Sequence, residues 1–155
     1  LGVALFRAGA APWHDDLDVL RRVAARARVA PLRVFESLDV WDICALLASS
    51  RGYCGSSLHG RIVATAFALP RLTLHHPSRA ACPGKHAAYA ATWEPAVVPV
   101  AVGVDHIARG IEDALAVDPR RLRETADALA ARHREGFDAI AVAPAGSPGD
   151  PGGRA

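Results

Sequence analysis

The sequence predicts an α/β fold in which a parallel sheet carries helices on both faces. Along most of its 155 residues, short apolar runs alternate with stretches whose apolar residues recur every three or four positions. The short runs are typical of buried strands, and the longer spacing is typical of amphipathic helices. Strands and helices that alternate in this way form parallel sheets with right-handed crossovers. At 51% hydrophobic residues, the chain is also apolar enough for one core. We therefore expect a single Rossmann-like domain.

The first third of the chain supplies the first strands and helices. Asp15 or Asp16 is placed to cap a helix that begins with Leu17, and Pro31 separates this helix from the next apolar run. A second amphipathic stretch follows Asp39. We expect strands at residues 1–6, 32–36 and 52–56, and helices from residue 17 to about 28 and at 39–49.

The remaining elements continue the alternation. Pro70 ends a helical pattern, and two prolines and a glycine mark residues 75–84 as a loop. Asp118 and Pro119 are typical of a helix start, and Gly136 is typical of a helix end. We expect helices at 58–69, 85–93, 105–116 and 118–135, and strands at 71–74 and 97–102. Residues 1–143 then form one domain, and the Gly- and Pro-rich residues 144–155 a disordered tail.

Composition excludes several classes of function. A formal net charge of +2, with arginines scattered among acids, argues against a nucleic-acid partner. The three cysteines (Cys44, Cys54 and Cys82) form no CxxC pair, which favours a reducing, cytoplasmic location. No apolar run approaches the roughly 20 residues of a membrane span, and the first residues do not resemble a signal peptide. The chain begins with Leu and contains no Met, so we expect it to be part of a longer protein.

Metal binding is also not expected. His75, His76, Cys82 and His86 lie close together in the sequence, but their spacing matches no tetrahedral zinc pattern.

The strongest candidate for a site is the turn between the predicted strand at 52–56 and the helix that follows. In parallel sheets, ligands bind beyond the carboxyl ends of the strands, where helix N-termini present free N–H groups and the positive end of a dipole. The turn combines glycines, hydroxyls and an imidazole: Gly55, Ser56, Ser57, Leu58, His59 and Gly60. An anionic group is the expected ligand. A plain helix cap without any ligand explains the same residues about equally well.

Two residues outside this turn are further candidates. Lys85 is the only lysine beside 17 arginines, which favours a need for an ammonium group at that position, although a single lysine can also survive by chance. His14 follows a predicted strand and loop, so it is placed to face the same cleft, although a helix cap formed with its acidic neighbours is the simpler interpretation.

The sequence from Asp42 to Leu74 resembles the signature region of the polysaccharide pyruvyl transferases. The resemblance lies in Ala45-Leu-Leu-Ala-Ser-Ser, in Gly55-Ser-Ser-Leu-His-Gly, in Ile62, Ala64 and Ala66, and in Leu69-Pro70, with Lys85 after the next strand and loop. It implies the C-terminal half of a B-type glycosyltransferase fold. It also implies transfer of the pyruvyl group of phosphoenolpyruvate to two sugar hydroxyls of a glycan, which forms a cyclic ketal. Phosphoenolpyruvate is the donor substrate, and no cofactor is required.

The resemblance assigns roles to the candidate residues. His59 acts as the acid or as a phosphate partner, the helix N-terminus from Ser57 to Gly60 holds the donor's carboxylate or phosphate, and Lys85 adds a point charge. Many family members carry Arg where Ser57 stands, and Arg61 compensates for it only if its side chain points back toward the turn. The resemblance also implies a missing N-terminal domain or a partner subunit.

Two other functions remain open. A nucleotide-sugar glycosyltransferase or epimerase half would need an acid that binds ribose near a strand end, and Glu94 is the only candidate. A non-catalytic α/β remnant would use the Gly-Ser-Ser turn as a cap alone. Trp41 and Trp93 are expected in the core rather than as sugar-binding platforms.

Overall fold

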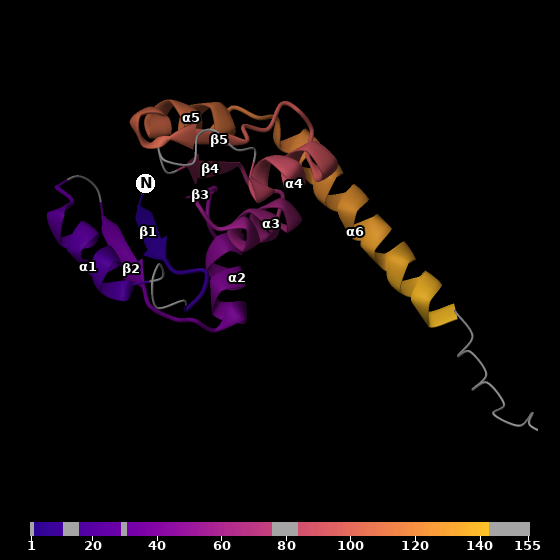
Figure 1. Cartoon of the computed structure of the whole chain (residues 1–155), viewed down its shortest axis with the longest axis horizontal. Coiled ribbons are helices and arrows are strands. Elements are labelled where there is room, and N and C mark those ends of the chain that lie inside the picture. The colour runs from indigo at the N-terminus through magenta and orange to yellow at the C-terminus, as the bar shows by residue number, and fades with distance from the viewer. Residues whose placement is uncertain (1, 11–15, 29–30, 76–83, 143–155) are drawn as a thin grey trace, which may run out of the picture.

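The computed structural model describes residues 2–10, 16–28, 31–75 and 84–142. Within these ranges strands and helices alternate along the chain, as Figure 1 shows. The strands are β1 (Val3–Phe6), β2 (Leu32–Phe35), β3 (Tyr53–Gly55), β4 (Arg71–His75) and β5 (Ala101–Gly103). The helices are α1 (Leu17–Arg26), α2 (Val40–Ala48), α3 (Leu58–Ala66), α4 (Lys85–Trp93), the 3₁₀ turn η2 (Val104–His106), α5 (Ile107–Leu115) and α6 (Pro119–Val142).

Every strand pairing in the described residues is parallel, so the predicted α/β class with parallel strands is confirmed. β1 pairs with β2, with Val3 opposite Leu32. β4 lies between β3 and β5, with Tyr53 opposite Arg71 and Thr73 opposite Ala101.

The prediction of one continuous sheet is wrong for the described residues. β1 and β2 form one sheet, and β3, β4 and β5 form another. A cavity of about 640 Å³ lies between the two sheets, lined by residues of both β1 and β3 together with residues of α2 and α5. Side chains rather than a hydrogen-bonded ladder join the two sheets, for example Phe6 of β1, whose ring centroid lies 6.2 Å from that of Tyr53 in β3.

Helices α3 and α5 cover opposite faces of the three-stranded sheet. Successive side chains of a strand point to opposite faces. Leu72 of β4 faces α5, where a Cβ added to Gly110 would lie 2.8 Å from it. Its neighbour Thr73 faces the other way, and its hydroxyl oxygen lies 3.1 Å from Arg61 Nη1 of α3. The sheet is therefore enclosed on both faces, as the sequence predicts.

Two small apolar clusters form the core on the α3 side. One joins α2, β3 and α3 through Leu47, Tyr53 and Ala64. The other joins the start of α6 to the segment before β5 through Val98, Val117 and Leu122. The first cluster includes Ala64 of α3, and Ala68, just after α3, packs against the second, so both hold the C-terminal part of the helix that carries the candidate site at its N-terminus.

The helix starts agree with the sequence signals. Asp16 caps α1 by accepting a hydrogen bond from Asp18 N at 2.8 Å, and Asp118 caps α6 by accepting one from Arg120 N at 2.9 Å. α3 ends at Ala66, ahead of the Pro70 boundary, and Ala68 takes a left-handed φ of 54° there. The chain can therefore turn into β4 immediately after Pro70.

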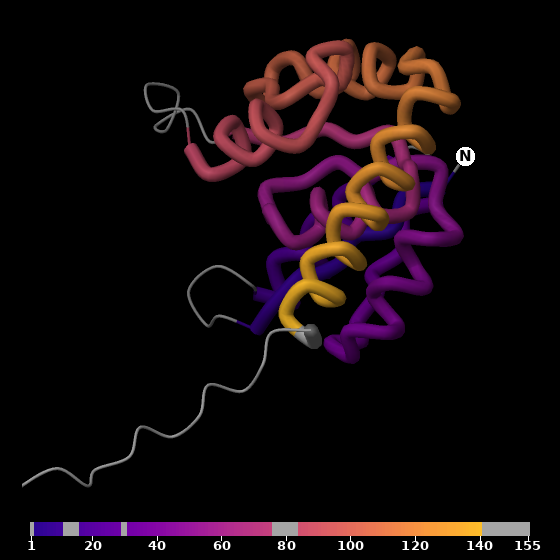
Figure 2. Tube along the Cα trace, turned by 90° about the vertical axis from the view of Figure 1, so that its right-hand side faces the viewer, coloured from indigo at the N-terminus to yellow at the C-terminus, as the bar shows by residue number. Residues whose placement is uncertain are grey.

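The predicted end of the last helix at Gly136 is wrong. α6 continues to Val142, because a glycine inside a helix costs only about 1 kcal/mol and its neighbours are good helix formers. In both views α5 lies at one end of the molecule and α6 leads away from it (Figure 1 and Figure 2). The second half of α6 is exposed, with Phe137 61% and Ile140 71% accessible.

Among the helices of the described ranges, none has the length and apolar character that a membrane span requires. Residues 144–155, predicted as a disordered tail, lie outside the described residues.

Candidate functional site

The turn from Gly55 to Gly60 lies at the carboxyl end of β3, as the sequence predicts. Gly55 is the last residue of β3, and Leu58 and His59 open α3. Ser57 caps the helix, because its Oγ accepts a hydrogen bond from Gly60 N at 3.3 Å. The turn therefore presents the N-terminus of a helix at the edge of the sheet where parallel α/β folds bind ligands.

Tyr53 fills the space beside both glycines of the turn. A Cβ added to Gly55 would lie 2.6 Å from the Tyr53 hydroxyl, and one added to Gly60 would lie 2.7 Å from the ring. The hydroxyl donates to Ser57 O at 3.0 Å and accepts from Ser57 N at 3.2 Å. Burial raises the pKa of Tyr53 to about 12, against the opposing hydrogen bond to Ser57, so the phenol keeps the proton that it donates. The two glycines thus have a packing role that sequence reasoning missed.

Two backbone amides of the turn remain free to bind a ligand. Ser57 N and Gly60 N have acceptors within the chain, whereas none of the described residues accepts from Leu58 N or His59 N. The His59 side chain is exposed beside these amides. An anion at this point would meet two N–H donors, the positive end of the α3 dipole and an accessible imidazole.

The N-terminus of α4 meets the same turn. His86, the second residue of α4, places its Nε2 3.1 Å from Ser56 O. Lys85 precedes it, is exposed, and has no ion pair within the described part of the chain. The N-termini of α3 and α4 therefore meet near the carboxyl end of β3, and each carries an exposed residue in its first turn, His59 on α3 and Lys85 on α4. Lys85, predicted as a site residue, is the first residue of α4, and the contact with the turn comes from its neighbour His86.

His86, considered from sequence only as a metal ligand, makes a contact with the turn that sequence reasoning missed. It is 7% exposed, and its Nδ1 lies 3.3 Å from Thr73 Oγ1. Burial lowers the pKa of His86, and the charges of Lys85, Arg61 and His75 lower it further, against the raising effect of the hydrogen bond to Ser56. The imidazole is therefore neutral at physiological pH. Its position directly after Lys85 was the only sequence signal.

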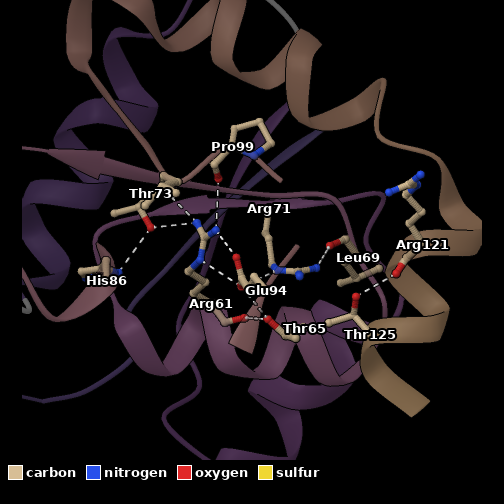
Figure 3. A network of polar contacts seen from close by, with 11 residues as sticks. Arg61, Thr65, Leu69, Arg71, Thr73, His86, Glu94, Pro99, Arg121 and Thr125 are labelled. Carbon is tan, nitrogen blue, oxygen red and sulfur yellow. Dashed lines mark hydrogen bonds and ion pairs between the residues drawn. The ribbon is translucent and has the colours of Figure 1, made fainter. Parts of the chain in front are cut away.

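A buried polar network joins α3 to β4 and to the segment between α4 and β5 (Figure 3). Glu94, whose side chain is 2% exposed, lies between the guanidinium groups of Arg61 and Arg71. Its Oε1 accepts from Arg71 Nε at 2.8 Å and from Thr65 Oγ1 at 3.1 Å, and its Oε2 pairs with Arg61 Nη2. Burial alone would raise the pKa of the Glu94 carboxyl, but the hydrogen bonds and charges of the two arginines outweigh it and lower the pKa.

Arg61 therefore does not compensate for the serine at position 57. Its guanidinium points away from the turn and donates to Thr73 Oγ1 at 3.1 Å, to Val100 O at 2.9 Å and to Pro99 O at 3.1 Å. These bonds tie α3 to β4 and to the segment that enters β5. Periodicity could not distinguish this arrangement from an arginine on the solvent face of a helix.

Three other residues considered from sequence lie elsewhere. His14 is outside the described residues. Trp41 and Trp93 were expected in the core, which is wrong, because Trp41 is 77% exposed and Trp93 40% exposed. Trp93 ends α4, at the opposite end of the helix from Lys85, and the Arg132 guanidinium lies 5.3 Å from its ring centroid.

No group of three or more His, Cys, Asp or Glu side chains suited to a metal ion occurs within the described ranges. His76 and Cys82 lie outside those ranges.

Comparison of the chain with protein-family models, with curated proteins and with solved structures gives no match. The case for a function therefore depends on the geometry and chemistry of the chain's own residues.

Proposed function

We propose that the chain is the donor-binding half of a polysaccharide pyruvyl transferase and that the turn from Gly55 to Gly60 binds phosphoenolpyruvate. The observation that carries the proposal is the meeting of the α3 and α4 N-termini through the contact between His86 Nε2 and Ser56 O. It brings the start of α4, with the exposed Lys85, next to the turn that opens α3, with the exposed His59 and the amides of Leu58 and His59. The proposed fold is the C-terminal half of a B-type glycosyltransferase.

Phosphoenolpyruvate carries its carboxylate and its phosphate on the same enol carbon, so it needs several cationic or N–H donor groups close together. The amides at the start of α3 suit one anionic group, and Lys85 suits the other as a point charge. Because Arg61 is fully engaged in the buried network, Lys85 is the main cationic partner that remains in the described part of this site. Donor affinity in this chain therefore depends on Lys85 more than on any residue of the turn.

The proposed reaction needs one proton donor near the enol. A proton adds to the CH₂ carbon of phosphoenolpyruvate, which leaves an oxocarbenium-like centre at the carbon that bears the phosphate. The first sugar hydroxyl attacks this carbon and loses its proton. The phosphate then leaves, the second hydroxyl attacks and loses its proton, and the ketal closes. Of the two protons released, one balances the proton added to carbon and the other leaves with phosphate. We propose His59 as the donor to carbon, since it is exposed at the turn and an imidazolium can donate a proton.

The glycan acceptor is proposed to bind to a further domain or a partner subunit that faces this turn, in the cytoplasm. Between the two rival functions, the structure disfavours the nucleotide-sugar enzyme. Glu94, the only acid considered for a ribose, is enclosed by Arg61 and Arg71 and is not available to a ligand.

Isothermal titration of the chain with phosphoenolpyruvate, inorganic phosphate and UDP tests the proposal. We expect phosphoenolpyruvate to bind more tightly than phosphate, and UDP not to bind. Lys85→Gln should weaken phosphoenolpyruvate binding by about tenfold, the loss of one charge-assisted hydrogen bond. Arg123→Gln, which removes an exposed positive charge on α6, is the matched control and should leave the affinity unchanged.

His59→Gln and His133→Gln form a second pair, because both imidazoles are exposed but only His59 lies at the turn. Phosphate release from phosphoenolpyruvate in the presence of glycan acceptor and the complementary half should fall in the first variant alone. Binding of UDP without phosphoenolpyruvate would favour the nucleotide-sugar enzyme, and binding of neither compound would favour a non-catalytic domain.

A further inference from the structure

The peptide bond between Ser56 and Ser57 is held from both sides by buried aromatic side chains. Its carbonyl oxygen lies 3.1 Å from His86 Nε2, and its N–H donates to the Tyr53 hydroxyl at 3.2 Å. In a planar trans peptide the C=O and N–H point in opposite directions, so two partners on opposite sides fix the rotation of the whole plane. This plane immediately precedes the free amides of Leu58 and His59.

The proton positions of His86 follow from its partners. A backbone carbonyl can only accept, so His86 Nε2 carries the hydrogen and donates to Ser56 O. The neutral ring must then accept at Nδ1, and the Thr73 hydroxyl at 3.3 Å supplies that hydrogen. The Thr73 oxygen in turn receives a hydrogen bond from Arg61 Nη1 at 3.1 Å. The three hydrogen bonds therefore all donate in one direction, from Arg61 to Thr73, from Thr73 to His86 and from His86 to Ser56.

We propose that His86 is a positioning residue that, together with Tyr53, sets the plane of the Ser56–Ser57 peptide and thereby aims the free amides at the start of α3 toward the ligand. The identity of the ligand in this role rests on the proposed function. The orientation of the peptide by His86 and Tyr53 does not. It explains why a buried histidine follows directly after the exposed Lys85: one residue orients the turn and the other supplies charge.

The surroundings of His86 keep it in the form that this role requires. The charged and titratable groups that face it are Lys85 on its own helix, Arg61 on α3 and His75 at the end of β4. All three disfavour a second proton on the ring, and burial acts in the same direction. A protonated ring would also leave the Thr73 hydroxyl without its acceptor.

Two variants of His86 separate positioning from packing. Gln keeps an N–H that can reach Ser56 O and an oxygen that can accept from Thr73, whereas Phe keeps the volume of the ring and removes both groups. Both variants are first tested for folding by thermal unfolding and far-UV circular dichroism. We then expect amide hydrogen exchange at Ser57 to become about fivefold faster in His86→Phe than in wild type, since one hydrogen bond is worth about 1 kcal/mol, and to stay within about twofold in His86→Gln.

Affinity for phosphoenolpyruvate should follow the same pattern: it should fall in His86→Phe and stay close to the wild-type value in His86→Gln. In the unliganded wild type, ¹⁵N chemical shifts of His86 should report the Nε2–H tautomer. His133→Phe on exposed α6 is the control and should change none of these quantities.

The inference is wrong if His86→Phe folds and keeps both the wild-type exchange rate at Ser57 and the wild-type affinity, or if His86 is in the Nδ1–H tautomer. Should the exchange and tautomer results hold while wild type binds no phosphoenolpyruvate, the proposed function fails and the positioning role of His86 stands. The two failures are therefore distinguishable.

Discussion

The part of the chain before α2 and the part built on β3, β4 and β5 differ in how they are held together. Of the described residues, none before Leu47 is buried, and Val23 on the apolar side of α1 is still 47% exposed. In the second part Leu72 and Thr73 are completely buried, and so are the side chains of Arg61 and Arg71. The candidate site lies in the second part. A site that must hold donors in fixed directions needs side chains whose own positions are locked by packing and hydrogen bonds.

Of the substitutions considered, one in the Glu94 network should lower the free energy of unfolding most. Glu94→Gln removes the only carboxylate between Arg61 and Arg71, so two buried cations lose their counter-charge. Breaking a buried ion pair in this way costs about 3–5 kcal/mol. Urea unfolding should report that loss, with Glu112→Gln on the exposed face of α5 changing the free energy of unfolding by less than about 0.5 kcal/mol. Equal unfolding midpoints for Glu94→Gln and wild type would contradict the account of this network.

Apolar truncations should give the next largest contrast. Leu122→Ala removes a side chain that is 1% exposed in the cluster at the start of α6 and should cost about 2–5 kcal/mol. Val23→Ala in α1 should cost less than about 1 kcal/mol, since the side chain is half exposed and alanine favours a helix. Denaturant unfolding of both variants measures the difference. If Val23→Ala were as damaging as Leu122→Ala, α1 would be packed far more tightly than its exposure indicates.

Two glycine substitutions should act with opposite signs. Gly60→Ala places a methyl group 2.7 Å from the Tyr53 ring and should destabilise by about 1–3 kcal/mol, as overpacking does. Gly136→Ala in α6 meets nothing within 4 Å and should stabilise by about 1 kcal/mol through helix propensity. Melting temperatures of the two variants should therefore move in opposite directions, and a gain for Gly60→Ala would show that Tyr53 does not fill the turn.

A smaller effect on the free energy of unfolding should appear in mild acid, where wild type and His86→Gln should differ. Because the pKa of His86 is lowered in the folded state, the unfolded chain binds more protons once the pH falls below the ordinary value of 6.5. Stability should therefore decline as the pH decreases from about 6.5, and His86→Gln should decline less over the same range. Glu94 stabilises the fold throughout this range, and its contribution is lost only as the pH falls below the ordinary value of 4.5 toward the lowered pKa of the folded state. Identical pH profiles of unfolding free energy for wild type and His86→Gln would contradict the neutral state of His86.

Local patterns predicted most of the elements because each depends on neighbouring residues. Asp16 and Asp118 cap helices as expected, and Pro70 separates α3 from β4. The end of α6 was not predictable, since Gly136 is equally compatible with a helix end and a helix interior when nothing packs against it.

For the candidate site, the sequence predicted the turn and Lys85 but not the residues that organise them. Tyr53 and His86 reach the Ser56–Ser57 peptide from a strand and from a helix on either side of the turn. Nothing in the periodicity of either element indicates where those side chains point. The same limit explains Arg61, whose spacing within α3 fits a solvent-exposed position as well as a buried one.

The sequence by itself determined the α/β class, the parallel strands and the place of the Gly55 to Gly60 turn, because alternating periodicity and turn residues act over a few positions. Only the tertiary structure decided that the strands divide into two sheets, that Glu94 is enclosed by two arginines, and that His86 contacts Ser56 of the turn. Each of these depends on residues far apart in the chain. His86 and Ser56 are 30 residues apart, and their contact exists only because β3 and β4 pair in one register and bring the starts of α3 and α4 together.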